Sequence, residues 1–293
     1  MRRLLQISIA LLFLAGIAGP AHAGTQGPTK SLGKAKGLEY RGATFPSVFS
    51  QAGATVGCKA DTFALGGGGV VDGADGLSTL VGSAPADLNK DTSANAWQAL
   101  GTSMNGRDER TYAICSKEAL PFVPGFTSFP ATPGEQTQDV GCPSPSERLV
   151  SGGVFNDEGN PVKILESRPL DTSADLDSVP DDGWRLIGEN TGGSVSNPTI
   201  LITCSDSAEL SYVTKTANVP ASALGKPVAK CPNRFAVSGG GFEAGGGGTP
   251  SGLTPWDSKD RKKVPEDGWK ASVYNASIDT LAVTSTAICL RTL

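Results

Sequence analysis

The feature that most constrains the fold of this chain is a threefold internal repeat. Each copy has a leading cysteine, a glycine run inside an apolar segment, a tryptophan, and a trailing cysteine. In the three copies the trailing cysteine lies 57, 62 and 58 positions after the leading cysteine. The tryptophan lies 39, 42 and 38 positions after the same leading cysteine. Such regular spacing indicates three related structural units. These landmarks are Cys58, Trp97 and Cys115, then Cys142, Trp184 and Cys204, then Cys231, Trp269 and Cys289.

The repeat divides most of the chain into three parts. Unit 1 spans residues 40–118, unit 2 residues 119–207 and unit 3 residues 208–293. Residues 24–39 are rich in Gly, Lys and Thr and stay outside the repeat. We expect this segment to form a disordered arm.

The first 23 residues have the composition of a secretory signal peptide. Arg2 and Arg3 precede an apolar run from Leu4 to Gly19, and an A-x-A cleavage site ends at Ala23. We therefore expect cleavage after Ala23 and a secreted or periplasmic product. No later segment is long and apolar enough to predict membrane insertion.

Cleavage would also change the chemistry available to the chain. It removes His22, the only histidine, and with it catalytic triads and zinc sites that depend on imidazole. Lys and Arg fall from 25 to 23 against 29 Asp and Glu, so the net charge moves from -4 to -6. The densest basic patch, Lys259 to Lys263, is surrounded by acids. A nucleic-acid partner is therefore not expected.

The segments between the landmarks have the alternation of β-strands. In WKASVYN, Trp269, Ala271 and Val273 share one face, and polar residues occupy the other. Turns carry PDDG and PEDG, and helix-period segments are absent after the signal. We predict an all-β protein. We favour a pseudo-threefold β-prism, because a small unit gains from sharing its core. Three tandem β-sandwich modules are the alternative, and the oligomeric state stays open.

The glycine runs favour strands over ligand loops. They recur at Gly66 to Gly69, at Gly152 with Gly153, and at Gly239 to Gly241. A phosphate-binding loop needs a following helix and usually a Lys-Ser or Lys-Thr pair, neither of which is present. We therefore predict strands in which glycine permits a bulge or the close approach of a neighbouring backbone. Backbone donors that line a ligand groove are the alternative. The structural glycines are Gly67, Gly68, Gly152, Gly153, Gly239 and Gly240.

Six cysteines in an exported chain indicate disulfides. Repeat symmetry leaves two pairings, one within each unit and one between neighbouring units. We favour pairing within units because it fits both architectures. Either pairing leaves no thiol as a nucleophile or metal ligand. The favoured bonds are Cys58–Cys115, Cys142–Cys204 and Cys231–Cys289.

The four tryptophans divide into two groups. Trp97, Trp184 and Trp269 recur once per unit on an alternating strand and are predicted to be core anchors. Trp256 stands where the other units have Leu170 or Ala86, so no repeated packing role accounts for it. Trp256 is therefore the candidate for an exposed side chain that contacts a ligand.

No residue pattern selects a catalytic, cofactor or metal site. The acids fall in loops beside Gly, Ser or Asn, which is typical of turns, and none has EF-hand spacing. The favoured function is a non-enzymatic exported protein that binds an extracellular glycan or a cell-surface component. The alternatives are a carboxylate-dependent hydrolase or lyase and a purely structural envelope or matrix component.

The repeat resembles those of secreted bacterial proteins of uncharacterised function. The resemblance is carried by Cys231-Pro232, Gly239 to Gly241, Gly268-Trp269, Asn275 and Ala287 to Cys289. Units 1 and 2 add a Ser-x-Pro element, which unit 3 replaces with Leu253-Thr254-Pro255. Unit 1 departs further, with Lys59 after its first cysteine and Ala96 before its tryptophan. This likeness covers most of the chain but implies no activity. The general pattern is also similar to vitelline membrane outer layer protein, which implies a β-prism and a carbohydrate-facing role.

Overall fold

The structure, a computed structural model, is all-β. It describes residues 25–26, 29–46, 52–73, 76–87, 94–126, 128–156, 162–172, 177–190, 194–258 and 263–291. The expected signal peptide and most of the Lys259 to Lys263 patch lie outside these ranges. Among the described residues, no helix has the length and hydropathy needed to cross a membrane.

The described strands follow the repeat. Unit 1 and the segment before it contain β1 (Thr25–Gln26), β2 (Lys30–Ala35), β3 (Leu38–Phe45), β4 (Ala52–Gly57), β5 (Phe63–Val71), β6 (Ser78–Ala86), β7 (Ala96–Ser103) and β8 (Glu109–Ser116). Unit 2 contains β9 (Phe122–Phe126), β10 (Gly134–Gly141), β11 (Arg148–Phe155), β12 (Lys163–Leu170), β13 (Gly183–Asn190) and β14 (Thr199–Ser205). Unit 3 contains β15 (Leu210–Val219), β16 (Leu224–Gly225), β17 (Val228–Lys230), β18 (Ala236–Glu243), β19 (Gly248–Trp256), β20 (Gly268–Asn275) and β21 (Leu281–Leu290).

These strands form three sheets, each built from two units. The first sheet has the order β1-β4-β7-β6-β11-β14-β9 and joins units 1 and 2. The second has the order β10-β13-β12-β18-β21-β15 and joins units 2 and 3. The third has the order β16-β20-β19-β5-β8-β3-β2, with β17 also on β20, and joins units 3 and 1. The pairs β6–β11, β12–β18 and β19–β5 therefore close the three units into a ring.

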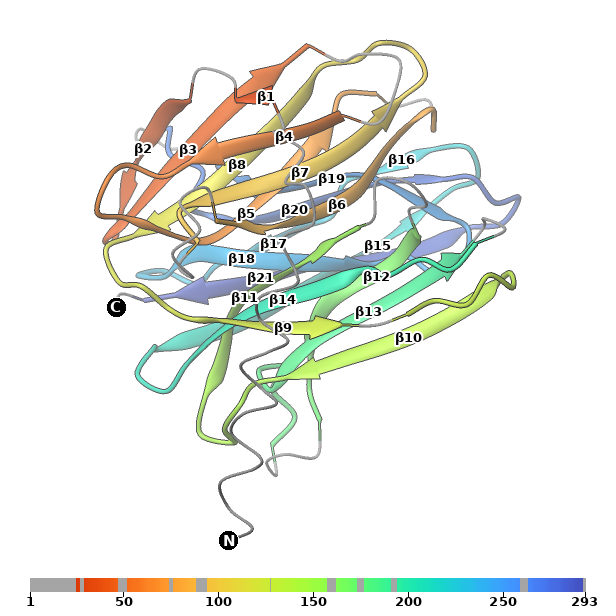
Figure 1. The fold of residues 1–293 in the computed structure, drawn as a ribbon. Coiled ribbons are helices and arrows are strands. Elements are labelled where there is room, and N and C mark those ends of the chain that lie inside the picture. Colours follow the sequence, from red (N-terminus) through yellow and green to blue (C-terminus); the bar gives the residue numbers. More distant parts are fainter. Residues whose placement is uncertain are drawn as a thin grey trace, which may run out of the picture.

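Each unit contributes one half-sheet to each of two neighbouring sheets, and its two half-sheets pack face to face. In unit 1, for example, β5-β8-β3 lies against β4-β7-β6. Figure 1 shows the resulting layers, with β3, β8 and β7 of unit 1 far from β10 and β13 of unit 2. Each unit is thus a small two-layer body, and strand pairing crosses every unit boundary. The name β-prism stays a prediction.

The disulfides join the two half-sheets of each unit. The bonds are Cys58–Cys115, Cys142–Cys204 and Cys231–Cys289, so pairing within units is confirmed and pairing between neighbours is wrong. In every unit the leading cysteine follows an edge strand of one half-sheet, and the trailing cysteine lies in the central strand of the other. All six cysteines are paired.

The repeated tryptophans are core anchors, as predicted. Trp97, Trp184 and Trp269 are each 1% exposed. The indole Nε1 of Trp97 donates to Ser83 Oγ at 2.8 Å, and that of Trp184 donates to Ser167 Oγ at 3.0 Å. Leu253 takes this place in unit 3, so among the described residues the Trp269 Nε1 has no acceptor.

Consecutive glycines of each run pack against different neighbours, one against the tryptophan of its own unit and the next against the backbone of a neighbouring unit. A Cβ on Gly67 would lie 2.4 Å from the ring of Trp97, and Gly152 and Gly240 face Trp184 and Trp269 in the same way. The next glycine admits the neighbouring unit. A Cβ on Gly68, Gly153 or Gly241 would lie 1.9, 2.1 or 2.2 Å from a carbonyl oxygen, belonging to Leu253, Ser83 and Ser167 respectively. Each glycine strand also contains a register shift, so the prediction of bulges and close backbone approach is confirmed.

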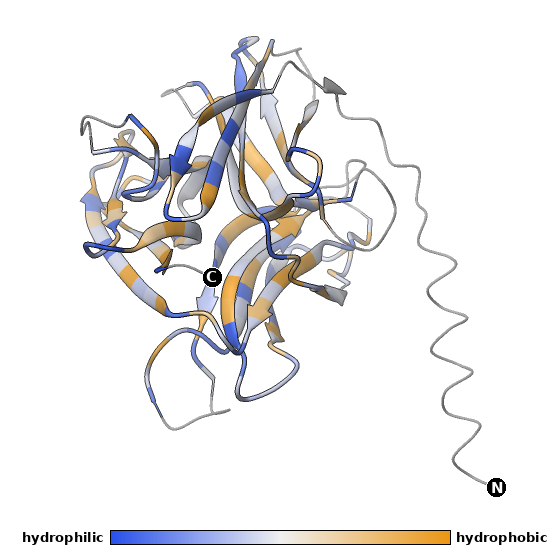
Figure 2. Cartoon of the chain, turned by 90° about the vertical axis from the view of Figure 1, so that its left-hand side faces the viewer, coloured by the Kyte–Doolittle hydropathy of each residue, from blue (hydrophilic) through white to orange (hydrophobic). Residues whose placement is uncertain are grey.

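One core reaches through all three units. A large cluster includes Leu65 and Ile114 of unit 1, Leu186 of unit 2 and Val237 of unit 3. The interior of unit 1 forms a second cluster around Trp97 and its disulfide. Hydrophobic and hydrophilic residues alternate along the strands in Figure 2, which is the pattern of sheets with one buried face.

The expectation of a disordered arm over residues 24–39 is wrong for its described part. Lys30–Ala35 forms β2 and Leu38–Phe45 forms β3, which pairs with the cysteine strand β8. Composition was misleading because the basic side chains face outward, whereas Leu38 is only 2% exposed. Tyr40 is fully buried, and its hydroxyl donates to the Val237 carbonyl of unit 3 at 2.8 Å.

Candidate functional site

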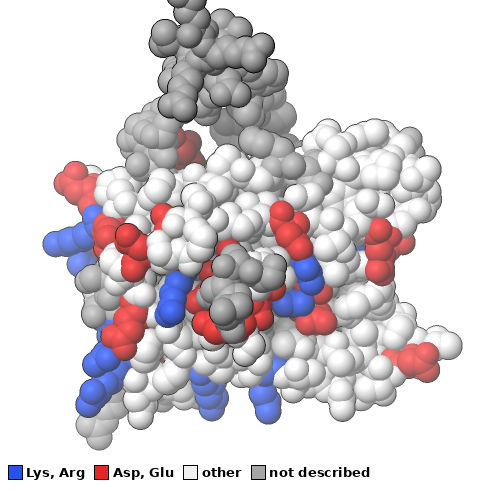
Figure 3. Space-filling model, turned by 90° about the horizontal axis from the view of Figure 1, so that it is seen from below, with Lys and Arg blue, Asp and Glu red and all other residues white. Residues whose placement is uncertain are grey.

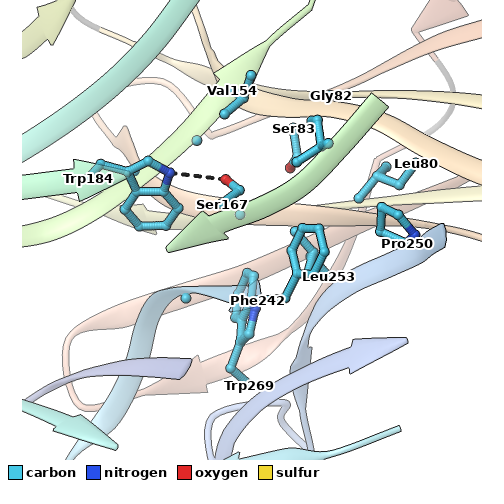
Figure 4. A pocket seen from close by; sticks show the side chains of 15 residues that line it. Leu80, Gly82, Ser83, Val154, Ser167, Trp184, Phe242, Pro250, Leu253 and Trp269 are labelled. Carbon is cyan, nitrogen blue, oxygen red and sulfur yellow. Dashed lines mark hydrogen bonds between the residues drawn. The ribbon is translucent and has the colours of Figure 1, made fainter. Parts of the chain in front are cut away.

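A small cavity lies where the glycine strands of the three units meet. Its walls include Gly67, Gly152 and Gly240, and Figure 4 shows Trp184 and Trp269 beside it. Its volume is about 20 Å³. One water molecule needs about 10–15 Å³ by this measure, so the cavity is too small for a sugar or a cofactor. The glycines here serve packing, and the alternative of a glycine-lined ligand groove is not supported at this place.

A larger hollow lies on the third sheet, where unit 3 meets unit 1. We call it the third-sheet groove and define it by Arg110, Lys226, Ser251, Thr254, Lys270 and Ser272, with Asp72 and Tyr112 at its side. Its volume is about 110 Å³. Both units are needed to form it, because Arg110 comes from β8 and Lys270 from β20.

The floor of the third-sheet groove is made of hydroxyl groups. Ser251 and Thr254 are each 3% exposed and Ser272 is 4% exposed. Ser251 Oγ donates to the Ser272 carbonyl at 3.4 Å. Within the described ranges, the hydroxyls of Thr254 and Ser272 make no hydrogen bond. These two groups are therefore free to donate to a molecule in the groove.

The walls of the third-sheet groove are cationic. Arg110 is paired with Asp72, but Lys226 and Lys270 make no ion pair with any described residue. Burial lowers the pKa of the half-buried Lys270, and the neighbouring charges of Lys226 and Arg110 lower it further against the opposing effect of Asp72. Two ammonium groups thus share a hollow without a matching carboxylate.

At the equivalent position on the second sheet, every cation is neutralised by a carboxylate of the protein. Arg185 follows Trp184 as Lys270 follows Trp269, and it makes a bidentate pair with Asp139 at 2.8 Å. Arg168 precedes Pro169 as Thr254 precedes Pro255, and its Nε lies 2.8 Å from Glu166 and 3.4 Å from Glu243. Every one of these cations faces a carboxylate.

Register identifies the substitutions that separate the two places. Glu166 pairs with Glu243 across the second boundary, and Gly252 pairs with Val70 across the third. The third sheet therefore lacks the two carboxylates that contact Arg168. It also has Val228 opposite Lys270, where the second sheet has Asp139 opposite Arg185. On the first sheet, Ala84 and Gln98 occupy the places of Thr254 and Lys270, so that boundary carries neither charge.

Trp256 lies outside the third-sheet groove. It ends β19 and is half-buried, and the Lys230 Nζ lies 5.3 Å from the centre of its ring. This ammonium covers one face of the indole in a cation–π contact. Trp256 does not line the groove, although it lies two residues beyond Thr254 on the same face of β19, and its role as a ligand contact stays a prediction.

The sequence alone did not reveal the groove residues. Lys270 and Ser272 lie on a strand whose alternation was recognised, but Thr254, Arg110 and Lys226 come from other segments. A signal was present in the aligned units, because a basic residue follows the tryptophan in units 2 and 3, whereas Asp139, which pairs with it in unit 2, is replaced by Val228 in unit 3.

A further hollow of about 390 Å³ lies on unit 1 beside residues 36–38 and 116–118, and Lys36, Lys117 and Glu118 are its charged lining residues. Among the described residues, no group of three His, Cys, Asp or Glu side chains is placed to hold a metal ion. On the face seen in Figure 3, acidic and basic side chains intermingle without a broad field of one sign. The chain matches no model of a known protein family, and no curated protein matches its sequence.

Proposed function

We propose that this chain is an exported, non-enzymatic binding protein that holds an extracellular glycan or a cell-surface component at the third-sheet groove. One observation carries the proposal. Of the three equivalent boundary places, only the third combines a hollow with cations and hydroxyls that have no partners among the described residues.

The scaffold supports a binding role. Three disulfides and a ring of shared sheets hold the groove walls, which come from two units, in a fixed relation. A rigid, preformed site loses little conformational entropy when a ligand binds. Disulfides also favour an oxidising compartment, which fits the expected export.

Binding to a glycan array and to isolated cell walls tests this function. Ser272→Ile gives the groove floor the residue that unit 2 has at the equivalent position, Ile187, and fills the hollow without changing charge. We expect wild type to be retained and Ser272→Ile to lose at least about tenfold in affinity, because the floor hydroxyl is lost and the hollow is filled. Trp256→Ala tests the predicted contact outside the groove, and binding should survive this change if the groove alone holds the ligand.

Two results would contradict the proposal. One is the absence of wild-type binding to any glycan or wall. The other is equal retention of wild type and Ser272→Ile at unchanged melting temperature. Loss of binding in Trp256→Ala alone would move the site to the Trp256 surface and would also overturn the assignment to the groove.

A further inference from the structure

We infer that the third-sheet groove binds a tetrahedral oxyanion, sulfate or phosphate, either free or as an ester on a sugar. This inference rests on the proposed function and gives the chemistry of its ligand. It concerns Lys226, Lys270 and Arg110 on the walls and Thr254 and Ser272 on the floor.

The first argument is the balance of charge. The three wall cations face one carboxylate in the groove, Asp72, which is already paired with Arg110. Asp108 acts on Arg110 electrostatically, but it is exposed and does not line the groove. A half-buried ammonium without a counter-ion is costly, and an anion in the groove would remove that cost. A metal cation would be repelled.

The second argument is the direction of hydrogen bonding. Ammonium and guanidinium groups only donate, and the Thr254 and Ser272 hydroxyls can donate once they have no other partner. At neutral pH a sulfate group has only hydrogen-bond acceptors, and a phosphate group has mostly acceptors. Either group can accept hydrogen bonds from several directions at once. Charge-assisted hydrogen bonds of this kind are about twice as strong as neutral ones.

The third argument is size. The groove measures about 110 Å³, several times the roughly 10–15 Å³ that one water molecule requires by the same measure. This space accommodates one tetrahedral group and leaves its ester substituent in the open mouth. It does not enclose a whole polysaccharide.

The fourth argument is a comparison with the equivalent position on the second sheet. There, Glu166 and Glu243 occupy the positions of Gly252 and Val70, and Arg168 bonds to both carboxylates. The scaffold is the same, but its own acids fill the role that an external anion would fill on the third sheet.

Titration of the purified, disulfide-bonded, isotope-labelled protein with sodium sulfate and sodium phosphate tests the inference, with ionic strength kept constant by sodium chloride. We expect saturable shifts of the Thr254, Lys270 and Ser272 amide signals. Lys270→Gln should weaken binding at least about tenfold. Val70→Glu, which copies Glu243, should abolish it. Lys215→Gln, which removes an equal charge from the exposed part of β15, should bind like wild type.

A second arm identifies the source of the oxyanion. Glucose 6-sulfate and glucose 6-phosphate are compared with glucose and with the inorganic ions. Tighter binding of the esters supports a sugar-borne group, and tighter binding of the inorganic ions supports a free oxyanion. Shifts no larger than those caused by chloride, or an equal loss of binding in Lys215→Gln, would overturn the inference.

The two proposals fail separately. If neutral glycans bind and Lys270→Gln has no effect on them, the proposed function stands and the oxyanion inference is wrong. If sulfate or phosphate binds at the groove but no glycan or wall component does, the oxyanion inference stands and the proposed function is wrong.

Discussion

The second-sheet and third-sheet boundaries have the same backbone and opposite electrostatics. At both boundaries a glycine of one unit packs against a backbone carbonyl of the neighbouring unit. A Cβ added to Gly241 on the second sheet would lie 2.2 Å from the Ser167 carbonyl oxygen, and one added to Gly68 on the third sheet would lie 1.9 Å from that of Leu253. Yet Arg168 and Arg185 are fully paired on the second sheet, whereas Lys226 and Lys270 are unpaired among the described residues of the third. The residues that join units are therefore constrained, and the outward residues beside them are free to diverge into a site.

The largest expected effect comes from the shared part of the two boundaries. Gly68→Val and Gly241→Val should each abolish cooperative folding, because their side chains would overlap the carbonyl oxygens of Leu253 and Ser167. Thermal unfolding followed by circular dichroism measures this. Gly141→Ala is the control, since its Cβ would come no closer than 3.8 Å to any neighbour, and it should change stability little. A folded Gly68→Val protein with wild-type stability would break the comparison.

The next effect comes from a difference between the interiors of units 1 and 3, where unit 1 buries an acidic side chain and unit 3 an apolar one. Glu109 stands six residues before its trailing cysteine, where unit 3 has Val283, and is 3% exposed. Burial raises its pKa from 4.5 to about 8. Between these pH values the folded state keeps a proton that the unfolded state has lost. Stability should therefore fall as pH rises from 4.5 to 8, by at most roughly 1.4 kcal/mol per pH unit, and be flat outside that window.

Chemical denaturation across this pH window, with wild type and Glu109→Gln, measures the slope. Glu109→Gln should remove it and be the more stable protein above pH 8. Glu118→Gln, at an exposed position, should leave the slope in place. A wild-type stability that stays constant across the window would show that Glu109 is ionised in the folded protein.

A smaller effect concerns the tryptophan anchors. Ser167→Ala would leave the Trp184 Nε1 without an acceptor, which is the condition of Trp269 in unit 3. We expect a loss of roughly 1–3 kcal/mol in the free energy of unfolding, measured by urea denaturation. Ser211→Ala on the edge strand β15 serves as the control. Equal values for both variants would mean that this hydrogen bond adds nothing to stability.

The smallest expected effect is on the surface of the third boundary. Val70→Glu should raise the pKa of Lys270 by supplying the missing carboxylate, which nuclear magnetic resonance titration of its ammonium group would show. The gain in stability should be no more than about 1 kcal/mol, because partly exposed ion pairs contribute little. Glu243→Gln on the second sheet is the reciprocal change. An unaltered Lys270 titration would show that the two boundaries are not equivalent.

Much of the fold followed from local patterns. Alternation predicted the strands, repeat symmetry reduced the disulfide pairings to two, and the place of the glycines identified them as packing residues. The predicted arm was wrong because β3 is held by Tyr40 and Leu38 against residues of unit 3 and β8, which no local composition reveals. Trp256, the one ligand contact predicted, does not line the groove. The hollow itself could not be predicted, because Arg110 and Lys226 come from segments that the repeat landmarks do not align.

What the sequence by itself determined is the content of each unit: its strands, its internal disulfide, its buried tryptophan and the glycines beneath it. These features arise from side chains within one copy of the repeat, so they can be predicted from the sequence of that copy alone. The tertiary structure decided how the copies join. Val70 pairs with Gly252 from the far end of the chain, and only that pairing places Arg110 beside Lys270. The physical reason is that charge balance at a boundary is a property of two surfaces, and neither surface carries it alone.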